Sequence, residues 1–143
     1  MLCADSASTA FFYCARNTAE PARARPVEVL YALLRQLCSS KLDQSVKEPV
    51  AREYEARKEK AEEDCSAIKR LTVEDCTRLI IELTRDHPAT IILDALDECE
   101  EDERYELLEA FDNIISSSGD VVKIFVSSRD DIDIVSHFYH IVS

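Results

Sequence analysis

The stretch Thr90-Ile-Ile-Leu-Asp94-Ala-Leu-Asp97-Glu98 decides how this sequence folds. Its first four residues suit a buried strand, and three carboxylates follow at once. A continuous apolar run is typical of a strand covered on both faces, as in a parallel sheet flanked by helices. Ligands of such sheets gather at the carboxyl ends of the strands, which is where Asp94, Asp97 and Glu98 fall.

Three carboxylates at a strand end repel phosphate but suit a hard cation. They can hold Mg²⁺ directly or through water, and the cation can then hold the phosphates of a nucleotide. The alternative is an ordinary buried strand whose acids begin the next helix, where the helix dipole favours negative charge. The pattern Asp-x-x-Asp-Glu at the tip of an apolar strand favours the cation site.

Size and composition restrict the classes of protein. The chain has 143 residues, 46% hydrophobic and 32% charged, which suits one folded domain. No apolar run approaches the roughly 20 residues that span a bilayer, and residues 1–5 lack the features of a signal peptide. The net charge of −12 argues against a nucleic-acid surface. We therefore expect a cytoplasmic protein that binds neither membrane nor nucleic acid.

The cysteines indicate an intracellular protein with reduced thiols and no cysteine-bound metal. They are scattered, contain no C-x-x-C pair, and lie mostly on the apolar faces of predicted elements, so we expect most of them to be buried thiols. With three histidines in the chain, a zinc site has little support. The six cysteines are Cys3, Cys14, Cys38, Cys65, Cys76 and Cys99.

Hydrophobic periodicity predicts strands that alternate with longer helices, and hence an α/β parallel sheet. Thr72-Val-Glu-Asp75 resembles a capping box at the start of one helix, and Gly119 fits the position after another. Predicted strands are 9–14, 89–94 and 121–126; predicted helices are 26–39, 44–66, 103–117 and one from 73 that ends before Pro88; 131–137 and 139–142 are expected to form a helical turn and a further strand.

Two predicted helices differ in character. Helix 44–66 carries charges of both signs at i,i+4 spacing, which indicates a solvated surface helix, with partner binding as the less favoured alternative. Helix 103–117 is amphipathic. The residues that it is expected to bury are Leu107, Leu108, Phe111, Ile114 and Ile115.

Arg129 follows the strand after the acidic one, preceded by two serines. Successive parallel strands end at the same edge of a sheet, so we expect Arg129 to approach Asp94 and Glu98. There it would meet the terminal phosphate of a nucleotide. The alternative is a surface pair with Asp130 or Asp131, which would contribute little.

Several motifs together carry a family resemblance. Thr90 to Glu98 resembles the Walker B segment of NACHT-type NTPases, and Lys123 to Arg129 resembles their sensor 1 strand. With Phe11-Phe-Tyr-Cys-Ala-Arg16 and Leu33-Leu-Arg-Gln-Leu37, they resemble the nephrocystin-3-like N-terminal NTPase domain. That domain occurs in fungal NLR-like receptors, often ahead of ankyrin repeats. The resemblance covers roughly residues 9–135.

The resemblance implies a three-layer P-loop fold of the signalling (STAND) class, here incomplete, with strands equivalent to β2, Walker B and sensor 1. Asp94 would bind Mg²⁺ through water. Glu98, with Asp97 beside it, would orient or deprotonate the attacking water. Arg129, with Ser128, would sense the γ-phosphate. ATP or GTP would then act as a switch for assembly.

The sequence also departs from the family pattern. It contains a single glycine, so a phosphate loop of the G-x-x-x-x-G-K-[ST] kind is not encoded. The family's first strand and Walker A loop would precede residue 9, where this sequence has only the eight residues of an expected leader, 1–8. We therefore expect one partial NTPase domain over 1–143, with an exposed hydrophobic edge at Val121–Val126.

The function that the resemblance implies is a nucleotide-binding NTPase module of an NLR-like signalling protein, with Mg²⁺ and ATP or GTP as cofactors. Catalysis by this chain alone is not expected, because most of the grip on phosphate comes from the loop. The alternative is a nucleotide-free interaction module. It would dock on another protein chain, or on a second copy, through the exposed edge or the charged helix 44–66.

Overall fold

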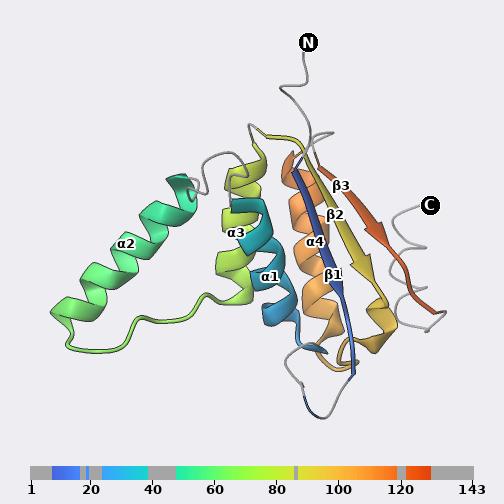
Figure 1. Ribbon diagram of the computed structural model, residues 1–143, viewed down its shortest axis with the longest axis horizontal. Coiled ribbons are helices and arrows are strands. Elements are labelled where there is room, and N and C mark those ends of the chain that lie inside the picture. The colour runs from blue at the N-terminus through green and yellow to red at the C-terminus, as the bar shows by residue number, and fades with distance from the viewer. Residues whose placement is uncertain are drawn as a thin grey trace.

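A three-stranded parallel sheet organises the protein (Figure 1). The computed structural model describes residues 8–16, 19, 24–38, 48–85, 87–118 and 122–129. The acidic strand β2 (Ala89–Asp94) lies in the middle, between β1 (Ser8–Tyr13) and β3 (Val122–Val126). This arrangement confirms the predicted α/β class and the three predicted strands.

Two helices pack on one face of this sheet, and a third packs on both of them (Figure 1). Helix α1 (Pro26–Cys38) packs on β1, and α4 (Arg104–Ser118) packs on β3. Helix α3 (Val73–Thr84) lies against both of these helices. The buried strand residues alternate, as expected for one covered face. Examples that are fully buried are Ala10, Ile91 and Leu93.

The other face of the sheet carries aromatic side chains. Phe11, Ile92 and Phe125 are in register across the three strands, and the two phenylalanines are 47% and 58% exposed. Within the described part of the chain, no helix packs on this face. The expectation that β2 is covered on both faces is therefore met on one face only, because both crossovers between adjacent strands run on the same side.

The two outer strands differ at their free edges. On β1, the Gln36 side chain accepts from the Phe11 backbone N–H at 2.9 Å and donates to the Phe11 carbonyl at 2.8 Å. This amide occupies the edge as a neighbouring strand would. Among the described residues, no such contact is found along the outer edge of β3. Within the described part of the chain, β3 is thus an edge strand, as predicted for Val121–Val126, of which Val121 lies outside that part.

Helix α2 (Glu48–Glu63) stands to one side of α3 (Figure 1) and docks on it through charges. Arg57 contacts Glu53 at 2.9 Å and Asp75 at 2.8 Å, and Arg78 reaches Glu53 at 3.2 Å. Asp75 also completes the predicted capping box of α3, because its carboxylate accepts from the Thr72 N–H at 2.9 Å. One carboxylate therefore serves both the docking of α2 and the first turn of α3.

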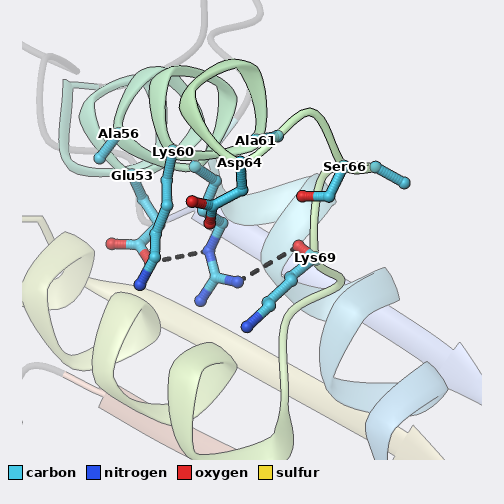
Figure 2. Close-up of a pocket in the computed structure, with 9 residues that line it drawn as sticks. Glu53, Ala56, Lys60, Ala61, Asp64, Ser66 and Lys69 are labelled. Atoms are coloured by element: carbon cyan, nitrogen blue, oxygen red, sulfur yellow. Dashed lines mark hydrogen bonds and ion pairs between the residues drawn. The ribbon is translucent and has the colours of Figure 1, made fainter.

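Hollows flank α2 on two sides. The first holds about 260 Å³ between α2 and residues 64–69, where Figure 2 shows Lys60, Asp64 and Lys69 around a polar space. The second holds about 250 Å³ and has apolar walls, among them Tyr31 and Ile68. Helix α2 packs mainly on α3, and its described side chains other than Ala61 are partly or fully exposed.

Helix α2 ends in a left-handed residue that is not glycine. Cys65 has φ of 52°, Ser66 N–H donates to Ala61 O at 2.9 Å, and Cys65 N–H donates to Glu62 O at 3.3 Å. This pair of bonds closes many helices and normally places glycine at the left-handed position.

Cys65 is exposed, whereas Cys14, Cys38, Cys76 and Cys99 are buried, as predicted for most of the cysteines.

Some expectations fail or lie outside the described residues. The predicted burial of Ile115 is wrong, because this residue is 40% exposed. Near its carboxyl end, α4 turns Ile114 toward the core and Ile115 toward solvent. Residues Gly119, 131–137 and 139–142 and Cys3 lie outside the described residues. No described helix is long and apolar enough to cross a membrane.

Replacing Asp75 with alanine should lower the free energy of unfolding by about 1–2 kcal/mol, since it removes a cap and an ion pair together. Partial burial alone would raise the pKa of Asp75, but hydrogen bonds from Thr72 and the charge of Arg57 lower it below its usual 3.8. The ionised form therefore stabilises the fold at neutral pH. That stabilisation is lost as the pH falls through the lowered pKa.

Urea unfolding of Asp75→Ala and wild type at several pH values measures this difference. Glu74→Ala is the matched control, because Glu74 is an exposed acid in the same first turn. It should cost only a few tenths of a kcal/mol. A difference between Asp75→Ala and wild type that does not shrink in acid would contradict the assignment.

Replacing Cys65 with glycine should raise the free energy of unfolding by about 0.5 kcal/mol, since a Cβ is unfavourable in the left-handed region. Thermal and urea unfolding would measure the gain. Cys65→Ala keeps the Cβ and removes the thiol, so it should show no gain; equal stability of the two variants would show that backbone strain is not the cause.

Candidate functional site

The turn after β2 carries the three predicted acids. Ala95 adopts a left-handed conformation (φ 61°, ψ 50°), and a short 3₁₀ helix, η2 (Leu96–Glu98), follows. An alanine there costs about 1–2 kcal/mol, so the turn needs support from its surroundings. Ser127, just beyond β3, supplies it: its hydroxyl accepts from Ala95 N–H at 3.0 Å, and its carbonyl accepts from Leu96 N–H at 2.9 Å.

Asp94 is the last residue of β2 and is half-buried. The Ser127 hydroxyl donates to one of its carboxylate oxygens, in a short hydrogen bond. Sequence reasoning selected the neighbouring Ser128. In the structure, the Ser128 hydroxyl donates to the Arg129 carbonyl at 2.8 Å instead. The serine that contacts the acidic turn is therefore Ser127.

Asp97 faces the residues that follow β3. Its carboxylate accepts from the Arg129 backbone N–H at 3.2 Å and lies 3.7 Å from the Arg129 Nε. The Asp97 side chain is only 11% exposed, whereas that of Arg129 is 85% exposed. Arg129 thus reaches the acidic turn as predicted, but the acid that it contacts is Asp97 rather than Asp94 or Glu98. The alternative partners Asp130 and Asp131 lie outside the described residues.

Glu98 is half-buried and ends η2. Within the described ranges its carboxylate makes no hydrogen bond or ion pair. No three acids, histidines or cysteines of the described residues lie close enough together to enclose a metal ion. The donor set fits a hard cation held through water by one carboxylate, with the second oxygen of Asp94 as the first candidate, rather than a closed cage.

A buried arginine lies beneath this turn, and sequence reasoning missed it. Arg104, the first residue of α4, is 1% exposed. Its Nη2 donates to the carbonyls of Asp97 at 3.0 Å and Cys99 at 3.2 Å. A buried cation must be compensated by such contacts, so it fixes the backbone that carries the acids. In sequence, Arg104 stands in the charged run 100–104 and resembles any surface residue.

The thiols beside the site are not activated. Burial raises the pKa of Cys14 to about 12 and that of Cys99 to about 11. Both are therefore protonated at neutral pH, and a thiolate nucleophile is not available at either position. The Cys99 Sγ instead donates to the Ala24 carbonyl at 3.1 Å. The chemistry of the site rests on its carboxylates and arginines.

Replacing Ser127 with alanine should lower the free energy of unfolding by about 1–2 kcal/mol, because the Ala95 N–H and the Asp94 carboxylate both lose a partner. The matched control is Ser128→Ala, which removes only the contact with the Arg129 carbonyl of the next residue. Chemical unfolding of both variants measures the difference. Equal stabilities would show that the Ser127 hydroxyl does not support the turn.

No curated protein and no solved structure matches this chain. The family model described as nephrocystin 3, N-terminal, matches residues 1–129, which is most of the chain. This protein belongs to the nephrocystin 3 N-terminal family.

Proposed function

We propose that this chain is a nucleotide-binding module of a NACHT-type, STAND-class NTPase in a cytoplasmic, NLR-like signalling protein. One observation carries the proposal: Asp94 ends the central parallel strand, and Arg129 arrives at the same edge from the neighbouring strand. Acids and an arginine at the carboxyl edge of a parallel sheet are what a metal-bound phosphate requires. Family membership and the resemblance to fungal receptors that carry ankyrin repeats support it.

The residues would divide the work as follows. Asp94 would hold Mg²⁺ through water, and when bound the cation would neutralise the phosphate oxygens. Glu98, whose carboxylate makes no hydrogen bond or ion pair with other described residues, would orient the attacking water or take its proton. Asp97 positions Arg129 by accepting its backbone N–H. The exposed guanidinium of Arg129 would contact the terminal phosphate of ATP or GTP, with Ser128 beside it.

The 143 residues contain one glycine and hence no Gly-x-x-x-x-Gly-Lys sequence. The backbone cradle that normally supplies most of the grip on a triphosphate is not encoded in them. We therefore propose weak, Mg²⁺-dependent binding and no hydrolysis by this chain alone. In a complete site, the nucleotide would act as a switch, because it would bind one conformation more tightly than the other.

A second function is favoured by the sheet face on which no described helix packs. Phe11 and Phe125 are exposed on it, and β3 has a free edge within the described part. An exposed aromatic face next to an open edge suits protein association. In this alternative, the chain docks on another protein or a second copy without nucleotide.

Binding of a fluorescent ATP analogue to the purified chain, with and without Mg²⁺, tests the first proposal. We expect saturable binding that requires Mg²⁺ and is at least about tenfold weaker in Asp94→Ala, equivalent to about 1.4 kcal/mol. Glu98→Gln is the matched acid control, since it removes the water-activating group and should leave binding within about twofold. Circular dichroism would show that each variant is folded.

Two outcomes would contradict this proposal. A folded wild-type chain that binds no nucleotide would favour the interaction module instead. Binding that is equal in wild type and Asp94→Ala would mean that the nucleotide does not use the acidic edge.

A further inference from the structure

Two arginines contact the same pair of carbonyl oxygens. The Arg104 Nη2 lies 3.0 Å from Asp97 O and 3.2 Å from Cys99 O. The Arg16 Nη2 lies 3.4 Å from each of these atoms. The backbone on either side of Glu98 is thus shared by two cations, one from the start of α4 and one from the end of β1.

The two guanidinium groups are held very differently. Arg104 is buried, and its two contacts have ordinary hydrogen-bond lengths. Arg16 is exposed, and both of its contacts are at the outer limit for a hydrogen bond. Because both side chains carry positive charge at shared acceptors, they repel each other. Arg104 is therefore the fixed partner, and Arg16 is held weakly.

Arg16 lies at the edge of the sheet that carries the acids. It follows β1 by three residues, and the Cys14 N–H between them donates to the Asp94 carbonyl at 3.0 Å. Arg16 therefore flanks Asp97 on its backbone side, while Arg129 flanks it on its carboxylate side. Two arginine side chains that follow different strands of the sheet thus reach the same acidic residue, one at its carbonyl and one near its carboxylate.

We propose that Arg16 is a further phosphate-contacting residue of the site. In the absence of nucleotide, it contacts the Asp97 and Cys99 carbonyls. This inference rests on the nucleotide-binding function proposed above. A guanidinium binds phosphate oxygens through charge-assisted, two-pronged hydrogen bonds, which are stronger than long contacts with neutral carbonyls. When a metal-bound triphosphate arrives, Arg16 exchanges the carbonyls for the terminal phosphate, and Arg104 keeps the turn in place.

The experiment measures binding of fluorescent ATP and ADP analogues, each with Mg²⁺, to wild type and Arg16→Ala. We expect Arg16→Ala to weaken ATP-analogue binding about tenfold and ADP-analogue binding less, because the lost contact is with the terminal phosphate. Arg16→Lys keeps the charge without the two-pronged geometry. Its affinity for the ATP analogue should therefore lie between those of wild type and Arg16→Ala. The unfolding temperature of Arg16→Ala should stay within about 2 °C of wild type, since only weak, exposed contacts are lost.

The matched control is Arg85→Ala. Arg85 is also an exposed arginine, but it follows α3 and precedes β2. It therefore lies toward the amino end of that strand, away from the acids at its carboxyl end. This variant should bind both analogues within about twofold of wild type. An equal loss in Arg85→Ala would attribute the effect of Arg16 to net charge alone and overturn the inference.

The remaining outcomes separate the two proposals. If Asp94→Ala loses binding but Arg16→Ala binds like wild type, the proposed function stands and the role of Arg16 is wrong. If Arg16→Ala unfolds many degrees below wild type, Arg16 is a structural clamp like Arg104, and the inference is overturned. If a folded wild-type chain binds neither analogue, the proposed function fails and this role falls with it.

Discussion

The carboxyl end of β2 is held by backbone hydrogen bonds from both neighbouring strands, and the candidate site depends on them. On one side, the Cys14 N–H donates to the Asp94 carbonyl at 3.0 Å. On the other, the Ser127 N–H donates to the Leu93 carbonyl at 2.9 Å. These bonds continue the parallel pairing past the ends of β1 and β3, so residues from three distant parts of the sequence reach one edge. The left-handed Ala95 can be sustained because its neighbours on both sides are fixed.

The main elements could be predicted because each has a strong local signal. Short-range patterns of apolar residues and turn chemistry predict the strand 89–94, the capping box at Thr72 and the edge strand β3. Parallel topology then places Arg129 at the acidic edge. The identity of its partner could not be predicted, because the rotation of the turn at Ala95 decides which acid faces β3. The same rotation selects Ser127 over Ser128.

Arg104 and Arg16 show a different limit. A buried arginine in a run of charged residues has no periodic signature, since its burial depends on carbonyl groups of a turn that the sequence does not reveal. Gln36 is similar: it occupies an apolar helix and yet satisfies both backbone groups of Phe11 across the β1 edge. These are polar side chains whose partners are main-chain atoms. Patterns of side-chain type along the sequence do not predict such main-chain partners.

Asp75 joins two units that would otherwise open independently. Helix α2 contacts the core through Val50 and a few charged groups, so its amides should open and exchange with solvent at a free energy well below that of global unfolding. Because the Asp75 carboxylate binds both Arg57 and the Thr72 N–H, separation of α2 changes the first turn of α3 as well. Separation of α2 would therefore affect a helix that packs on both α1 and α4, through two hydrogen bonds that share one carboxylate oxygen.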